Sequence, residues 1–218
     1  MSEYHIPVLL DESVTALVGD ALSGVYADAT FGGGGHSREI LSRLTQAGRL
    51  LAFDRDSDAL ANKPDDNRLV LIHNNFRFIH NYVLAEGYGD GIDGILADLG
   101  VSSHQFDTAD RGFSFRFDAP LDMRMNKEAT LTAADIINDY EKEDLEKILR
   151  IYGEVDNARK MAQLITSARA NAKITTTGEL DKVLEPVLPS FASHKILAKV
   201  YQALRIEVNH EMRSLEKF

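Results

Sequence analysis

The stretch Asp28-Ala29-Thr30-Phe31-Gly32-Gly33-Gly34-Gly35-His36 decides the fold of this 218-residue chain. It follows a short apolar run that begins at Val25 and precedes residues 37–44, whose leucines and isoleucine recur at helical spacing. Glycines at such a turn let the backbone approach a ligand closely, and the N–H groups at the start of the next helix point to the same place. The stretch therefore predicts a strand, a ligand-binding glycine loop and a helix.

Three more strand-like segments follow within the first hundred residues, at 49–54, 68–73 and 91–98. Near-continuous apolar strands separated by helices are typical of a parallel sheet covered on both faces, here expected in the order 3-2-1-4. The dinucleotide fingerprint G-x-G-x-x-G fails in every register, because Ser37 or Arg38 stands where its third glycine is needed. This failure argues against a nicotinamide-dependent oxidoreductase.

Polar and aromatic side chains follow the ends of these strands, where ligands of parallel sheets bind. Asp28 suits a cationic ligand such as S-adenosylmethionine better than a pyrophosphate, or it serves as a turn or cap residue. Asp54 is placed to accept hydrogen bonds from ribose hydroxyls. Phe76 could stack on adenine or belong to the core, and Asp98 could accept a hydrogen bond from an amine or cap a helix. Gln105 gives a weaker signal, because polar loop residues are common.

From about residue 105 the sequence changes character. Residues 106–127 show no clean period and predict a long ordered loop, after which Thr132 and Thr176 begin predicted capping boxes. The helices expected in this part span 132–138, 142–151, 155–171, 177–187 and 194–217. We therefore expect an α/β domain at 1–105, an all-helical domain at 106–210, and a return to the first domain at 211–218.

The charge is unevenly distributed along the chain. The net charge is −10 overall, with −8 in residues 1–104 and +4 in residues 150–205. A local basic excess is what a phosphate-binding surface needs, although a solvated helix surface would have the same composition. Charge alone leaves both interpretations open.

Several classes of protein are excluded by what the sequence lacks. The chain has no cysteine, which excludes disulfides, thiolate metal sites and thiol nucleophiles and fits a reducing cytoplasm. It has neither an apolar run near 18 residues nor a basic start like that of a signal peptide, so we expect a cytoplasmic protein without a membrane partner. The seven histidines show no metal-ligand spacing, so no metal site is expected.

Seven separated blocks resemble, in the same order, the MraW/RsmH family of bacterial methyltransferases. That family modifies a cytosine of 16S rRNA, in the small ribosomal subunit, on its exocyclic 4-amino group. The blocks are His5–Glu12, Asp28–Ser37, Leu51–Asp56, Gly94–Ser103, Arg111–Phe115, Pro120–Met125 and Tyr201–Asn209.

The resemblance implies a fold and a set of cofactor-binding residues. The fold is a class I methyltransferase (Rossmann-like) parallel sheet with an all-helical inserted domain, and the cofactor is S-adenosylmethionine. The inserted domain would then recognise 16S rRNA. Carried over position by position, the cofactor residues are Gly34, Gly35 and His36 in the loop, Asp54 at the ribose, Phe76 beside adenine, and Asp98 and Gln105 near the methionine end.

The resemblance also implies direct methyl transfer to an amine nitrogen. The cytosine amine is a poor nucleophile, and an acceptor hydrogen-bonded to it would help to localise its lone pair. Asp98 is the first candidate for that acceptor and Asp122 the second. The target base has to be unstacked first, and Phe113, Phe115 or Phe117 could stack on it or pack in the core.

Members of the family continue beyond the point that corresponds to Phe218. We therefore expect the C-terminal strands of the sheet to be missing from this chain. An alternative to an active enzyme is a fragment that binds the cofactor or RNA without transferring a methyl group. The fourth strand would have an unpaired edge, which predicts marginal stability, association such as a homodimer, or a partner that covers the edge.

Overall fold

The chain is divided into two compact units in a computed structural model that describes residues 7–218. The first unit runs to Ser102 and also takes up Arg213–Phe218, and the second unit is Ser103–Met212. The boundaries expected from the sequence, at residues 105 and 211, lie within three residues of these. His5, the first residue of the first resembling block, lies outside the described residues.

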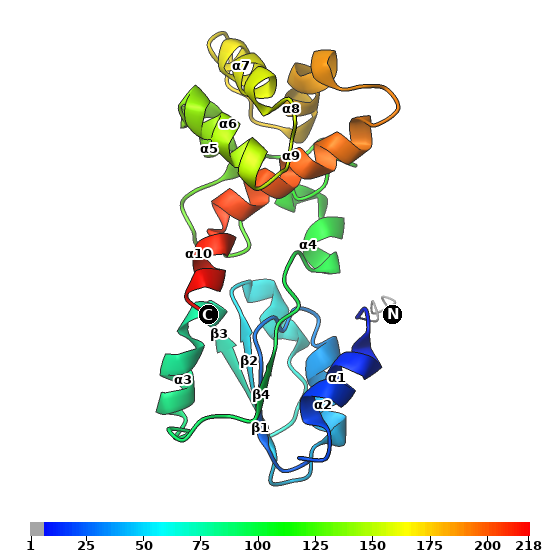
Figure 1. The fold of residues 1–218 in the computed structure, drawn as a ribbon, viewed down its shortest axis with the longest axis vertical. Helices are drawn as coiled ribbons and strands as arrows, with labels where there is room; N and C mark the ends of the chain where they lie inside the picture. The colour runs from blue at the N-terminus through cyan, green and yellow to red at the C-terminus, as the bar shows by residue number, and fades with distance from the viewer. Residues whose placement is uncertain (1–6) are drawn as a thin grey trace. The chain divides into compact units, whose positions relative to one another are not determined.

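A parallel sheet of four strands forms the centre of the first unit (Figure 1). Its strands are β1 (Val25–Asp28), β2 (Arg49–Asp54), β3 (Leu69–His73) and β4 (Gly94–Leu96). Their order is β3-β2-β1-β4, which confirms the predicted order. Within the described residues β4 pairs with β1 alone, and association through its outer edge stays a prediction.

Helices cover both faces of the sheet, as Figure 1 shows. Alternate residues of β2 point to opposite faces, because side chains alternate along a strand. Leu50 and Ala52 pack in the cluster that includes residues of α1 (Leu10–Val18) and α2 (Gly35–Arg43). Leu51 and Phe53 pack in a second cluster with Ile79 and Val83 of α3 (Ile79–Ala85). The central strands β1 and β2 are therefore buried on both faces, as their near-continuous apolar runs predicted, whereas Ile95 of β4 is 44% exposed. Two 3₁₀ helices, η1 (Ser57–Asn62) and η2 (Phe76–Phe78), complete the connections.

The second unit is helical and packs around its own core. Its elements are α4 (Ser103–Asp107), η3 (Ala109–Arg111), α5 (Ala133–Asp139), α6 (Lys142–Ile151), α7 (Ala158–Arg169), α8 (Thr177–Leu184), η4 (Glu185–Val187) and α9 (Ser193–Val208). The two predicted capping boxes are both present, at the starts of α5 and α8. Ile136, Leu149, Met161, Ile165 and Leu204 are buried where these helices meet. No helix within residues 7–218 is long and apolar enough to cross a bilayer.

The prediction of one helix over 194–217 is wrong. The chain breaks after Val208 and continues as α10 (Glu211–Glu216), and His210 has a left-handed φ of 48° between the two helices. At the break, the side chain of Asn209 forms hydrogen bonds with the backbone of the 123–125 segment. The long loop predicted at 106–127 also differs, since it contains η3.

Candidate functional site

The ends of the four strands bring the predicted acidic residues to one edge of the sheet. In the register of the sheet Asp28 pairs with Ala52 on one side and Leu96 on the other, and Asp54 pairs with His73. The strands β1 and β4 thus end level with Ala52, two residues before the ends of β2 and β3, and all four loops leave from the carboxyl ends of the strands. This is the edge at which parallel α/β sheets bind ligands.

The glycine loop combines tight packing on one side with open space on the other. Gly34 has φ 76° and precedes α2, and a Cβ there would lie 2.9 Å from Cζ of Phe31. A Cβ on Gly35 would lie 2.5 Å from Cγ of Pro7. Gly32 also has a positive φ, of 52°, but the nearest atom to its Cβ position is 3.9 Å away. Gly34 and Gly35 are thus required by packing, and Gly32 leaves room for a ligand to approach the backbone.

Two side chains that sequence reasoning missed hold this loop in place. Arg38 donates hydrogen bonds to the carbonyl oxygens of Gly33, at 2.7 Å, and Asn62, at 2.8 Å. Nδ2 of Asn62 donates to the carbonyl oxygen of Gly32 at 3.2 Å. An arginine in the first turn after a glycine loop is a signal that the sequence offers. The contribution of Asn62, thirty residues away, is visible only in the fold.

Asp54 links the end of β2 to the glycine loop. Its carboxylate accepts hydrogen bonds from the backbone N–H of Gly32 at 2.7 Å and of Asp56 at 2.8 Å. Burial raises the pKa of this carboxyl above its usual value, and the two N–H groups offset only part of that effect. Each carboxylate oxygen still has a second lone pair with which to meet a ligand hydroxyl.

Asp28 is fully buried beneath the loop. One oxygen accepts from the N–H of Thr30 at 3.0 Å, and the other accepts from Oγ of Ser37 at 2.7 Å. Burial raises its pKa, and these hydrogen bonds together with the nearby His36, itself buried, lower it in part. These contacts are those of a turn residue, which was the alternative interpretation of Asp28. Contact between Asp28 and a ligand stays a prediction.

Asp98 differs from the other two acids because it is exposed. Its backbone N–H donates to Oγ1 of Thr30 at 2.8 Å, which ties the segment after β4 to the segment after β1. The carboxylates of Asp98 and Asp28 are close enough for the charge of Asp98 to raise the pKa of Asp28. The strand ends therefore present three groups: the exposed carboxylate of Asp98, the backbone of Gly32 with no side chain against it, and the half-buried carboxylate of Asp54.

Phe76 opens η2 at the end of β3, as predicted. It packs against the core cluster that includes Phe53, and its ring meets the ring of Phe218 edge to face, with centroids 5.2 Å apart. The preceding Asn75 donates from Nδ2 to Oγ of Ser214 at 3.1 Å. The aromatic predicted to lie beside adenine is thus half-buried, with one edge held by the C-terminal segment.

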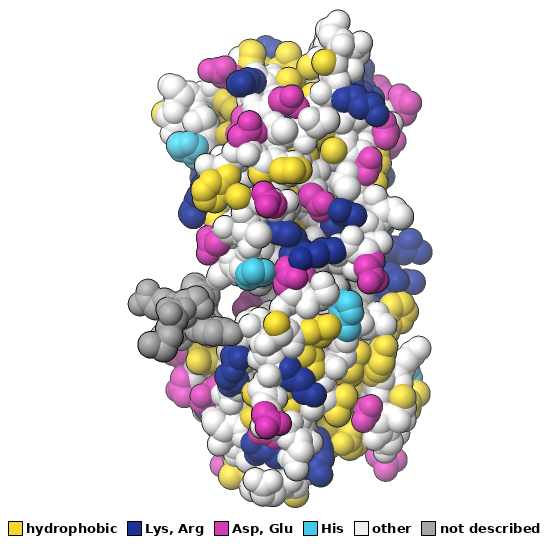
Figure 2. Space-filling model, turned by 180° about the vertical axis from the view of Figure 1, so that it is seen from behind, with side chains coloured by type: hydrophobic (Ala, Val, Ile, Leu, Met, Phe, Trp, Pro, Cys, Tyr) yellow, Lys and Arg dark blue, Asp and Glu magenta, His cyan; other side chains and the backbone are white. Residues whose placement is uncertain are grey.

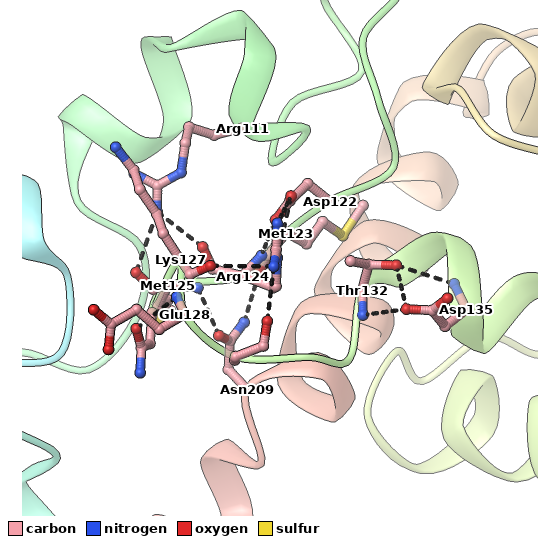
Figure 3. A network of polar contacts seen from close by, with 12 residues as sticks. Arg111, Asp122, Met123, Arg124, Met125, Lys127, Glu128, Thr132, Asp135 and Asn209 are labelled. Atoms are coloured by element: carbon pink, nitrogen blue, oxygen red, sulfur yellow. Dashed lines mark hydrogen bonds and ion pairs between the residues drawn. The ribbon is translucent and has the colours of Figure 1, made fainter.

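Gln105 and Asp122, the remaining predicted residues, belong to the second unit. Gln105 is buried in α4. Asp122 forms an ion pair with Arg124, in which Nη2 donates to Oδ2 at 2.6 Å and Nε to Oδ1 at 3.0 Å (Figure 3). Burial raises the pKa of Asp122, but the hydrogen bonds and charge of Arg124 outweigh it, so the pKa lies below its usual value. Asp122 is therefore an ionised group that already has a cationic partner.

The segment that carries Asp122 is held rigidly by its neighbours, as Figure 3 shows. Met123 is fully buried with a left-handed φ of 58°, which is uncommon for a residue other than glycine. Asn209 accepts from the N–H of Met125 and donates to the carbonyl oxygen of Met123. Arg111, also buried, donates to the carbonyl oxygen of Met125 at 3.2 Å. Strain of this kind persists only where the surroundings enforce it.

Comparison with known proteins identifies the family. The model of the MraW methylase family matches residues 2–218. Curated relatives named "Ribosomal RNA small subunit methyltransferase H" include one from Bacteroides fragilis, 54% identical over 214 residues, which are 98% of this chain and 70% of the relative. Others are from Flavobacterium johnsoniae, 53% identical over 99% of this chain and 71% of the relative, and Christiangramia forsetii, 51% identical over 100% and 72%. The chain, with its methyltransferase-type sheet and glycine loop, belongs to the MraW methylase family.

Proposed function

We propose that this protein transfers a methyl group from S-adenosylmethionine to the exocyclic 4-amino group of a cytosine in 16S rRNA of the small ribosomal subunit. The observation that carries the proposal is the exposed Asp98 at the same sheet edge as the open backbone of Gly32 and the half-buried Asp54. The names of the relatives support the class of substrate.

The chemistry of the strand ends fits S-adenosylmethionine. Asp54 has the lone pairs to accept from ribose hydroxyls, and Gly32 lets the ligand come against the backbone because no side chain fills that space. The half-buried Phe76 offers a ring to adenine. Asp98 would attract the ammonium of the methionine end. When bound, S-adenosylmethionine supplies a methyl group activated by attachment to a positively charged sulfur.

Asp98 is also our first candidate for the group that acts on the substrate amine. The nitrogen lone pair of the cytosine amine is delocalised into the ring, so a carboxylate that accepts a hydrogen bond from the amine helps to localise that pair on nitrogen. The remaining contribution is positioning, which holds the amine in line with the methyl group. Asp122 stays the second candidate, although its carboxylate is already bonded to Arg124.

The helical unit is the part of the chain that we expect to contact rRNA. Its basic segment 150–205 has a net charge of +4, which suits phosphates. Basic and acidic side chains are interspersed over the face seen in Figure 2. Phosphates of the rRNA that bound to that face would therefore meet separate basic side chains and not one continuous basic area. Contacts between side chains and unpaired bases would have to supply the binding energy that the attraction between phosphates and basic side chains does not.

The test is transfer of a labelled methyl group from S-adenosylmethionine to 16S rRNA and to small ribosomal subunits, followed by nucleoside analysis. We expect label in a cytidine methylated on its 4-amino group. Asp98→Asn should lower kcat by about 10²–10⁴-fold if it removes the acceptor from the reaction. Asp122→Asn is the matched comparison and should have the smaller effect. Label in any other nucleoside, or equal turnover by Asp98→Asn and the unchanged protein, would contradict the proposal.

A further inference from the structure

Aromatic side chains are exposed on the helical unit in two segments, 113–117 and 189–200. Phe191 is 91% exposed and Phe117 is 47% exposed. Phe191 lies in the connection between η4 and α9, which loops outward from the helices of its unit in Figure 1. Leaving a whole phenyl ring in water forgoes roughly 1.5–3 kcal/mol of burial. The fully exposed ring of Phe191 and the half-exposed ring of Phe117 therefore need an explanation.

The two segments meet through stacked rings. The rings of Phe115 and His194 are nearly parallel, at 12°, with centroids 5.8 Å apart. Phe115 is half-buried and His194 is exposed, so the stacked pair extends from the interior to the surface of the unit. Below them, Phe115 meets the buried Tyr201 edge to face at 5.6 Å. The exposed ring of His194 is therefore packed on Phe115, which is itself packed on the buried Tyr201.

The charged side chains within the two segments are all cationic. Segments 113–117 and 189–200 together contain three lysines and arginines, namely Arg116, Lys195 and Lys199, and no aspartate or glutamate. The guanidinium of Arg116 lies over the ring of Phe106 at 4.9 Å from its centroid, which adds a further planar group.

The nearest carboxylates are already bonded to the protein. Asp118 accepts from the N–H of Gly178 at 3.0 Å. Asp181 accepts from the hydroxyl of Tyr201 at 3.1 Å, and it lies close enough to interact electrostatically with both Asp118 and His194. The two segments thus combine planar rings with three cations, and the neighbouring carboxylates of Asp118 and Asp181 are each hydrogen-bonded to the protein.

We propose that Phe117, Phe191, His194, Arg116 and Lys195 form a surface that binds unpaired RNA nucleotides by stacking. We call these five residues the aromatic surface. The proposal rests on the proposed function and deepens it, because it assigns part of the substrate's binding site. Every nucleobase has a face that stacks on an aromatic ring, and the phosphates between bases need cations at the edge. A double helix offers no such faces, so the aromatic surface favours single-stranded segments.

The experiment measures binding of the whole chain to a fluorescent, unpaired RNA of about 12 nucleotides, with a duplex of the same length for comparison. The variant Phe117→Leu/Phe191→Leu keeps apolar bulk but removes both rings. We expect it to bind the unpaired RNA roughly 5- to 100-fold more weakly, and the tyrosine pair Phe117→Tyr/Phe191→Tyr to bind normally. Lys195→Gln should lower the slope of log affinity against log salt by about 0.7.

Ile151→Ala is the matched control, because Ile151 is an apolar side chain of α6 that is 57% exposed in the same unit and is not one of the five residues. It should bind RNA like the unchanged protein. Equal binding by the leucine pair, an equal loss in Ile151→Ala, or tighter binding of the duplex would overturn the aromatic surface. Calorimetry with S-adenosylmethionine on the same samples separates the two proposals: absence of binding by the unchanged protein would count against the proposed function and not against RNA stacking.

Discussion

Replacing Asn209 by alanine should loosen the segment that carries Asp122. The Asn209 side chain is buried and accepts from the N–H of Met125 at 2.8 Å, while it donates to the carbonyl oxygen of Met123 at 2.7 Å. Alanine would leave both backbone groups without these partners. A buried polar group that loses its partner costs about 1–3 kcal/mol, so we expect the free energy of unfolding to fall by about 3 kcal/mol.

Hydrogen exchange at the Met125 amide is the direct assay. If this segment opens locally, a loss of about 3 kcal/mol speeds exchange by roughly 100-fold, since about 1.4 kcal/mol corresponds to a factor of ten. Asn171→Ala is the matched control, because Asn171 is exposed in the same unit, and such a change should cost less than about 0.5 kcal/mol. Unchanged exchange at Met125 in Asn209→Ala would refute the reasoning.

Three other predictions concern single sites. Ser37→Ala should lower the free energy of unfolding by about 1.5–3 kcal/mol, because it removes a donor from the buried carboxylate of Asp28; an unchanged thermal midpoint would contradict this. Burial raises the pKa of Asp28 in the folded state. Its contribution to stability is therefore largest below the pKa of the unfolded state, about 4, and is lost as pH rises through the pKa of the folded state. Urea titrations across this range should show a free energy of unfolding that falls with pH, and Asp28→Asn should flatten that dependence. Gly112→Ala should cost more than about 2 kcal/mol, since its Cβ would lie 2.2 Å from the carbonyl oxygen of Pro120. Gly87→Ala, with a positive φ but open space, should cost less by thermal unfolding.

The sheet could be predicted from the sequence because each strand and its following loop are marked by residues that are close together in the chain. Residues 50–53 are apolar without a break, as the middle of a strand buried on both faces must be, and the glycine loop marks the end of the first strand. The capping boxes at Thr132 and Thr176 were predicted for the same reason, since each involves residues three apart.

The helix break at Asn209 could not be predicted in this way. Apolar residues continue at helical spacing through Val208 and Met212, which favours one long helix. At the break Asn209 donates to the carbonyl oxygen of Met123 and accepts from the N–H of Met125, more than eighty residues earlier in the chain. Tertiary contacts of this range override local periodicity.

The candidate site shows the same division. The positions of Asp28 and Asp54 at strand ends follow from the predicted sheet, but their exposure does not. Asp28 is turned inward to Ser37, whereas Asp98 is exposed, and no local pattern distinguishes them. The pairing of Asp122 with Arg124, two residues away, is a signal that the sequence did contain.

The central claim is that the strand ends hold S-adenosylmethionine, and calorimetric titration of the chain with S-adenosylmethionine tests it most directly. We predict one molecule bound per chain. Asp54→Asn should weaken this binding by roughly 10- to 100-fold, because a hydrogen bond to a charged group contributes about 1.5–3 kcal/mol. Asparagine keeps one oxygen that can accept from the N–H of Gly32 or of Asp56, and the thermal midpoint of the variant, measured alongside, should show that the fold survives. No binding heat, or equal affinity in Asp54→Asn, would contradict the account.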